Sequence, residues 1–351
     1  MSPFEPEKRD EHADVSIHDV ARAAGVSVST VSRVLNDKPD VAKKTRARVQ
    51  RVIDEMGYTP FVQTFQPNAV NTNTIALHYP LQRQSRLEVT DVELDFILGA
   101  SSAAGDERFA LNLLTRDVTE NELLDLYRTG QVRGVILMET TFDDWRVDLL
   151  RRYDLPFVMI GRCANNEGIS YIDIDLEAAV VKAFEHLTEL GHRQIGFLAF
   201  PDAVDDHQQN ASELMLAGYK RVVFEHGLPT LYRHVDLGIQ HAYEATHEIL
   251  RENPDLTAMV MAYGATASGV TRALNEHNKS VPHDFSLIGV AVGKIAELIS
   301  PTLSSVDFPL QNVGFQAAKM LINNLSSSTP RVQQLIVPPQ LNARETTRSI
   351  E

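Results

Sequence analysis

Residue patterns that mark catalysis are missing from this 351-residue sequence. We find no nucleophile elbow, phosphate loop, dinucleotide fingerprint or helical histidine pair that could hold a metal. The glycine-flanked stretch 264–269 lacks the lysine and the spacing of a phosphate loop. Asp173 and Asp175 share one face of an alternating strand, where helix capping or solvent exposure is the commoner role. We therefore predict no catalytic, metal or cofactor site, and no enzymatic activity.

Contact with DNA is the chemistry that residues 16–60 suggest instead. Ser16 is a good N-cap for an amphipathic helix that Gly25 ends, and Ser27 caps a second helix after a tight turn. Small polar side chains around Arg33 suit a face that reads a DNA groove. A third helix ends at Gly57 and directs lysines and arginines outward, where phosphates would lie. Two short helices joined by a glycine-containing turn are typical of the helix-turn-helix, whose second helix enters the major groove. The alternative is a small helical protein-interaction module with a solvated basic rim.

The charge distribution agrees with a DNA-binding segment on an acidic body. The whole chain has a formal net charge of −14, yet residues 16–60 contain eight Lys or Arg against five Asp or Glu. The first fifteen residues are acidic and contain two prolines, which predicts a disordered tail.

No apolar run is long enough for a membrane helix, the start lacks a secretory signal, and the single cysteine, Cys163, allows no internal disulfide. We expect a cytoplasmic protein.

The rest of the chain has the pattern of an α/β protein. Residues 61–73 are polar and contain proline, so they predict a linker. From Thr74 onward, short apolar runs alternate with amphipathic stretches, which predicts βαβ units and parallel sheets. The expected helices lie near 177–190, 213–225, 241–251 and 311–325.

Two sets of sequence motifs resemble the lactose-repressor (LacI/GalR) family of transcription regulators. DVARAAGVSVSTVSRVLN and TRARVQRVIDEMGYTP are similar to its headpiece, while HLTELGHRQIGFL, LAGYKRVV, VPHDFSLIGV and SPTLSSVDFPLQNVG are similar to its core. The resemblance covers nearly the whole chain. It implies an N-terminal three-helix helix-turn-helix headpiece followed by a periplasmic-binding-protein-like core of two doubly wound α/β subdomains.

The resemblance also implies domain boundaries. The tail would span 1–15, the DNA-binding domain 16–60, the hinge or linker 61–73 and the effector-binding and dimerisation core 74–345. Within the core, the first subdomain would include about 74–162 and 292–325, and the second about 163–291 and 326–345. The chain would cross between them near Arg162, near 290–293 and near 325–330.

By the same resemblance, Val28 and Ser29 read bases, and Arg33 contacts a base or a phosphate. In the family, a hinge helix inserts a leucine into the minor groove, but the matching position here is Pro67, which costs about 3 kcal/mol inside a helix. The hinge is then either a short turn with Phe65 as a minor-groove wedge, which we favour, or an extended segment. The predicted DNA-binding residues are Ser16, Ile17, Ser27, Val28, Ser29, Thr30, Ser32, Arg33, Asn36 and Phe65.

The effector pocket departs from the family pattern. The usual arginine before LAGY is Glu213, the usual Asn–Asp pair is Tyr263–Gly264, and a usual aspartate is Ala291. Carboxylates and aromatic faces can grip a saccharide, and they suit a cationic or partly apolar ligand equally well. The predicted effector-binding residues are Tyr79, Glu139, Trp145, Arg162, Glu213, Tyr263 and Ala291.

The resemblance implies a repressor of carbohydrate uptake or catabolism genes. It would bind a pseudo-palindromic operator as a homodimer, without a tetramerising tail, under the control of a small molecule such as a saccharide. One alternative is a sugar-binding protein with no role on DNA. Another is a regulator that responds to a non-sugar ligand such as a nucleoside or an amine.

Overall fold

The computed structural model describes residues 17–35, 41–56, 58, 72–80, 91–201, 209–236 and 238–350. The predicted tail and most of the predicted linker lie outside the described residues, as do Ser16, Asn36, Phe65 and Pro67. The chain divides into two compact units. One contains the N-terminal part up to Thr72 with Val118–Arg133 and Trp145–Pro156; the other contains Asn73–Asp117, Gly134–Asp144 and Phe157–Glu351.

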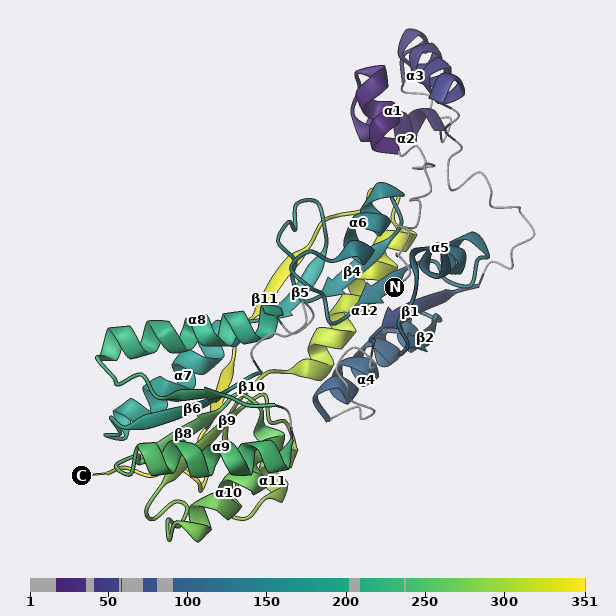
Figure 1. Cartoon of the computed structure of the whole chain (residues 1–351). Helices are drawn as coiled ribbons and strands as arrows, with labels where there is room; N and C mark the ends of the chain where they lie inside the picture. The colour runs from purple at the N-terminus through teal and green to yellow at the C-terminus, as the bar shows by residue number, and fades with distance from the viewer. Residues whose placement is uncertain are drawn as a thin grey trace, which may run out of the picture. The chain divides into compact units, whose positions relative to one another are not determined.

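Three helices form the N-terminal cluster, as the apolar spacing predicts: α1 (Ile17–Ala24), α2 (Val28–Leu35) and α3 (Lys43–Met56) (Figure 1). Their buried side chains make one small core, to which α1 contributes Ile17, Val20, Ala21 and Ala24, α2 Val31 and Val34, and α3 Val49 and Ile53. Each helix buries its apolar face against the other two, and this burial stabilises the cluster. The same unit contains α5 (Glu120–Arg128), which begins with a Thr119–Glu122 capping box, and α6 (Trp145–Arg152).

The larger unit contains two six-stranded sheets. The first has the order β11-β5-β4-β3-β1-β2, and all of its neighbouring strands are parallel. Its strands are β1 (Thr74–His78), β2 (Ala110–Leu114), β3 (Val135–Leu137), β4 (Phe157–Ile160), β5 (Tyr171–Ile174) and β11 (Gln334–Val337).

The second sheet has the order β12-β10-β9-β8-β6-β7, and only β12 is antiparallel to its neighbour. Its strands are β6 (Ile195–Ala199), β7 (Tyr232–His234), β8 (Ala258–Met261), β9 (Ser286–Val290), β10 (Ser304–Asp307) and β12 (Gln340–Asn342). In both sheets the strand order reverses beside the first strand. The carboxyl ends of strands at such a switch point are where open α/β sheets bind ligands.

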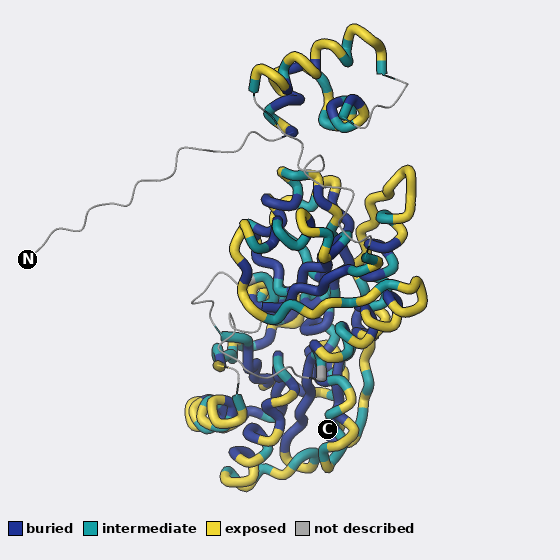
Figure 2. Tube along the Cα trace, turned by 90° about the vertical axis from the view of Figure 1, so that its right-hand side faces the viewer, coloured by how far each residue is buried: buried dark blue, intermediate teal, exposed yellow. Residues whose placement is uncertain are grey.

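Helices cover the sheets and bury the apolar strands, which are dark blue in Figure 2. α12 (Leu310–Ser326) packs along α4 (Asp91–Asp106) and on β3, β4 and β5 of the first sheet. On the second sheet, α7 (Leu176–Glu189) contacts β8, β9 and β10, while α8 (Gln209–His226) packs on α7 and β6. α9 (Ile239–Glu252) packs on β6, β7 and α10 (Ala267–Glu276), and short α11 (Ile295–Leu298) precedes β10. None of the described helices combines the length and apolar character that a bilayer span requires.

Strand pairing corrects the predicted subdomain boundaries. β5 falls in the predicted second subdomain but pairs with β4 in the first sheet. β10 falls in the predicted first subdomain but pairs with β9, and β11 falls in the predicted second but pairs with β5. The chain therefore crosses between sheets after β5, after β10 and after β11, one strand later than expected each time. Apolar runs identify strands, but only backbone hydrogen bonds decide to which sheet a strand belongs.

Candidate DNA-binding and effector sites

The predicted reading helix α2 has a polar surface. Ser27, Ser29 and Arg33 are exposed, whereas Val28, Thr30 and Ser32 are half-buried. Ser27 caps the helix: its Oγ accepts from the Thr30 amide at 3.2 Å and lies 2.8 Å from the hydroxyl oxygens of both Ser29 and Thr30. The three hydroxyls therefore form one cluster at the helix N-terminus, the end from which this motif contacts bases and phosphates.

One predicted DNA contact requires a correction. The Ile17 side chain is 5% exposed and belongs to the core of the three-helix cluster, because helical spacing directs it inward with Val20 and Ala21. The Ile17 side chain is therefore packed within the cluster and does not form part of its polar surface. On α3, Lys43, Lys44, Arg48 and Arg51 are exposed.

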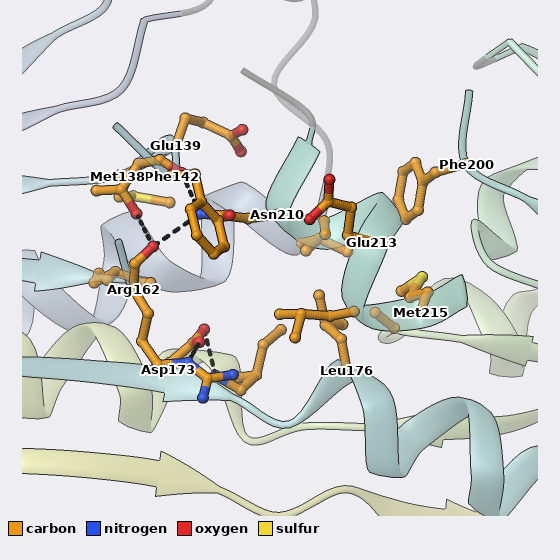
Figure 3. Close-up of a pocket in the computed structure, with 18 of the residues that line it drawn as sticks. Met138, Glu139, Phe142, Arg162, Asp173, Leu176, Phe200, Asn210, Glu213 and Met215 are labelled. Carbon is orange, nitrogen blue, oxygen red and sulfur yellow. Dashed lines mark hydrogen bonds and ion pairs between the residues drawn. The ribbon is translucent and has the colours of Figure 1, made fainter. Parts of the chain in front are cut away.

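A cavity of about 600 Å³ lies in the larger unit, lined by residues that follow the carboxyl ends of strands in both sheets. Met138 and Glu139 follow β3, Arg162 follows β4 by two residues, and Phe200 follows β6. Tyr263 and Ala291 follow β8 and β9, and the first turns of α8 provide Asn210 and Glu213 (Figure 3). Parallel strands place these residues together because all of their carboxyl ends meet at one edge of each sheet.

Five of the seven predicted effector residues line this cavity: Glu139, Arg162, Glu213, Tyr263 and Ala291. Tyr79 does not, because its side chain is only 1% exposed and packs in the main hydrophobic core with Phe96. Trp145 is half-buried at the start of α6 and is not among the described lining residues.

Two lining residues have left-handed backbones. Glu139 has φ of 50°, and so does Ala291. Neither is glycine, so the conformation costs free energy that the surrounding fold must supply. Such backbones concentrate at functional sites, and here each turns the chain sharply at the end of a strand beside the cavity.

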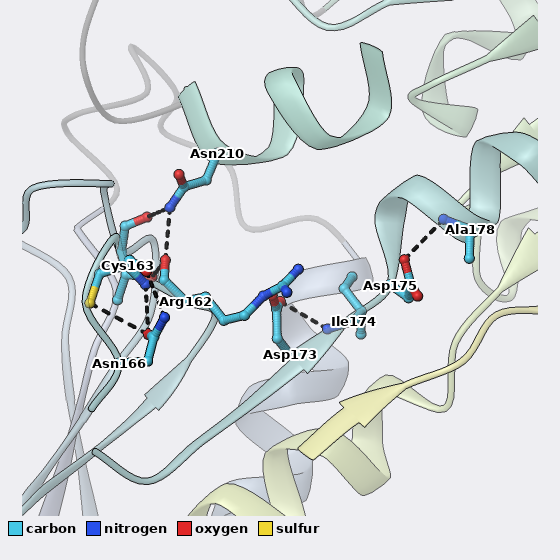
Figure 4. Close-up of polar contacts among 9 residues, drawn as sticks. Arg162, Cys163, Asn166, Asp173, Ile174, Asp175, Ala178 and Asn210 are labelled. Atoms are coloured by element: carbon cyan, nitrogen blue, oxygen red, sulfur yellow. Dashed lines mark hydrogen bonds and ion pairs between the residues drawn. The ribbon is translucent and has the colours of Figure 1, made fainter. Parts of the chain in front are cut away.

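A polar network fixes one wall of the cavity (Figure 4). The Asn210 Nδ2 donates to the carbonyl oxygens of Thr140, at 3.1 Å, and Arg162, at 2.8 Å. The Arg162 Nε donates to Asp173 Oδ2 at 2.6 Å, and Asp173 Oδ1 accepts from the Ile174 amide at 2.8 Å. Burial raises the pKa of Asp173, while Arg162 acts in the opposite direction.

Asn210, Phe142 and Phe200 also line the cavity, although they are not among the residues predicted from the sequence. Asn210 lies three residues before Glu213, so helical spacing places both on one face of α8, which the sequence pattern already contained. Phe142 and Phe200 are ordinary apolar residues in sequence, and no local signal distinguishes them. Within the described ranges, no group of three His, Cys, Asp or Glu side chains is placed to hold a metal ion.

Two parts of the chain match models of known protein families. Residues 16–60 match the family described as bacterial regulatory proteins, lacI family, and residues 184–347 match the periplasmic binding protein-like domain. The transcriptional regulator CelR of Thermobifida fusca is 30% identical over 333 residues, which span 93% of this chain and 96% of that protein. Catabolite control protein A of Priestia megaterium is 26% identical over 347 residues, 95% of this chain and 100% of that protein.

Among solved structures, the complex of transcriptional regulator CelR with cellobiose matches with a TM-score of 0.69 at 28% identity, over 95% of this chain and 99% of that one. Sequence identity over 93% of the chain, the helix-turn-helix and the two doubly wound sheets all lead to one assignment. The chain belongs to the lacI family of DNA-binding transcriptional regulators.

Proposed function

We propose that this protein represses genes of carbohydrate uptake or catabolism and that a small molecule in the cavity controls its affinity for operator DNA. The observation that carries the proposal is the presence, in one chain, of a polar reading helix and a cavity built at strand ends. Related regulators include one solved with cellobiose and one named ribose operon repressor, which favours a saccharide or a related metabolite. As a regulator of operator DNA, the protein would act in the cytoplasm and perform no chemistry on its ligand.

The proposed DNA contacts are the exposed and half-buried residues of α2. Ser29 and Arg33 would hydrogen-bond to base edges or phosphates, and Val28 would offer apolar contact, for instance to a thymine methyl. Exposed lysines and arginines on α3 would contact the phosphate backbone of the DNA, so the affinity for DNA would fall as the salt concentration rises.

The proposed effector contacts are Glu139, Arg162, Glu213, Tyr263 and Ala291. A ligand changes operator affinity only through different affinities for the DNA-competent and DNA-incompetent arrangements of the protein. Because the cavity contains residues from the ends of both sheets, a ligand there would favour one arrangement of these strand ends over another.

The protein would bind its operator as a homodimer. The exposed leucines of the larger unit include Leu94 and Leu98 on α4, at 43% and 45%, Leu113 on edge strand β2, at 42%, and Leu298 on α11, at 80%. Leu94 and Leu98 are one helical turn apart, and Lys294 Nζ lies 4.0 Å from Asp95 Oδ1, which brings α11 near α4. A second copy of the chain would cover this apolar surface, and two headpieces would then read a pseudo-palindrome.

A binding selection on random duplex DNA tests the DNA role. The full chain should recover an inverted repeat, and Val28→Ala and Ser29→Ala should each change the recovered bases, with about 1–3 kcal/mol lost on the original site. Gln50→Ala, at an exposed position of α3, is the matched control and should recover the original repeat. Recovery of the original repeat by both α2 variants would refute the assignment of the reading helix.

A further inference from the structure

The charged side chains around the cavity are unbalanced. Among the described lining residues, four carry a carboxylate, Glu93, Glu139, Asp173 and Glu213, and one, Arg162, carries a guanidinium. Arg162 already forms an ion pair with Asp173, at 2.6 Å, so this cation is largely neutralised within the wall. Glu213 forms no such pair with a described residue, and its carboxylate therefore favours a cation over an anion in this part of the cavity.

Asn210 adds an acceptor whose direction is fixed. Both carbonyl oxygens that its Nδ2 meets can only accept, so the opposite orientation of the amide would bring three oxygens together. Its Oδ1 is buried and has no hydrogen-bond partner among the described residues. A buried acceptor without a donor costs free energy, and a donor from a ligand would remove that cost. In Figure 3 this oxygen is directed toward the side of the cavity where Glu213 lies.

Glu213 is the acceptor most open to a ligand. It is exposed on the same face of α8 as Asn210, and no hydrogen bond or ion pair joins it to another residue of the described chain. Glu139, held by its left-handed backbone, contributes a second carboxylate to the lining. An ionised carboxylate can only accept hydrogen bonds, so this part of the cavity favours a ligand with several hydrogen-bond donors.

Aromatic and aliphatic side chains complete the walls. Phe200 and Tyr263 lie with ring centroids 6.3 Å apart and tilted by 45°, and Phe142 is 50% exposed at the cavity. Aromatic faces attract cations and also pack against the apolar face of a ring or chain. The walls therefore suit a positive group carried on a body with an apolar face.

We propose that the effector carries a protonated amine, which binds among Glu213, Glu139 and the Asn210 amide oxygen while its body packs on the aromatic walls. An amino sugar and an aralkylamine both satisfy this chemistry. An ammonium group supplies three donors and a positive charge, whereas a hydroxyl at the same place supplies one donor and no charge. The inference rests on the proposed effector site and defines the class of its ligand.

Calorimetric titration of the full chain with matched probes tests the inference. Glucosamine is compared with glucose and N-acetylglucosamine, and phenethylamine with 2-phenylethanol. At least one amine should bind about tenfold more tightly than its neutral counterpart, as expected for a charge-assisted contact. Glu213→Gln, which keeps the size and removes the charge, should abolish that difference. Glu225→Gln, at an exposed position further along α8, is the control and should preserve it.

Equal or tighter binding of the neutral partners would overturn the inference, as would an amine preference that survives both Glu213→Gln and Glu139→Gln. Failure of every amine probe to bind at millimolar concentration would also overturn it. Operator binding is measured separately without ligand. If operator is bound and a neutral saccharide releases it, the proposed function stands and the amine inference fails; if no operator is bound, the proposed function itself fails.

Discussion

His192 joins the C-terminal segment to the second sheet through both ring nitrogens. The ring is 1% exposed; Nδ1 lies 2.9 Å from Thr257 Oγ1, and Nε2 lies 2.9 Å from Ser286 Oγ and 3.2 Å from the Arg348 carbonyl oxygen. A carbonyl oxygen can only accept, so Nε2 carries a proton. The Thr257 hydroxyl lies within reach of both Nδ1 and the Gln194 carbonyl oxygen, at 3.4 Å, and burial of the ring favours its neutral form.

Burial lowers the pKa of His192 below its ordinary value of 6.5. The unfolded chain therefore binds more protons than the folded chain, and stability falls as the pH drops through 6.5. Urea unfolding should show a lower free energy of unfolding at about pH 5.5 than at about pH 7.5. Burial also lowers the pKa of His186, which acts in the same direction.

The variant His192→Gln should lose about 1–3 kcal/mol at neutral pH, because it disrupts a buried network. Its stability should also depend less on pH than that of the original protein. His283→Gln, at an exposed position, controls for the loss of an imidazole. An undiminished pH dependence in His192→Gln would show that this residue is not the source.

At the scale of elements, the contact between α4 and α12 depends on two glycines. A Cβ added at Gly99 would lie 1.8 Å from the Gln311 carbonyl oxygen, and one at Gly314 would lie 2.0 Å from the Phe96 carbonyl oxygen. Real Cβ atoms do not approach so closely, so the two backbones pack at a distance that only glycine permits. The helices would have to separate to accept any larger residue.

Gly99→Ala should therefore destabilise the protein by about 2 kcal/mol or more, since overpacking outweighs the gain in helix propensity. Gly105→Ala is the matched control in the same helix, because a Cβ there meets nothing within 4 Å. It should stabilise by about 0.5–1 kcal/mol. Urea unfolding of both variants would measure the contrast, and equal effects would contradict the close-packing argument.

At the scale of the whole molecule, the exposed leucines of α4, β2 and α11 bear on assembly. If they form the dimer interface, Leu98→Glu places a charge in it and should produce monomers at micromolar concentration in sedimentation experiments. Operator affinity should fall with dimerisation, because each monomer then binds a single half-site. Phe224→Glu, on α8 at a position that is 87% exposed, should remain dimeric. A dimeric Leu98→Glu protein would place the interface elsewhere.

The sequence by itself determined the three headpiece helices and the alternation of apolar strands with helices in the rest of the chain, because their signals are local. The spacing of Ile17, Val20, Ala21 and Ala24 directs one face of α1 inward wherever the helix lies. Continuous apolar runs such as 286–290 mark buried parallel strands for the same reason. Short or more polar strands such as β7 carry too little local signal to be predicted.

Only the tertiary structure decided which strands share a sheet and which side chains reach the cavity. β5 pairs with β11, which is far away in sequence, and β10 lies between β9 and β12. No local sequence pattern specifies these neighbours. Tyr79 follows a strand as Glu139 does, yet it packs in the core while Glu139 lines the cavity. Asn210 becomes an oriented acceptor only because two carbonyl groups, 70 and 48 residues away in sequence, bind its amide. Such contacts arise from the packing of distant segments, and helical or strand periodicity does not encode them.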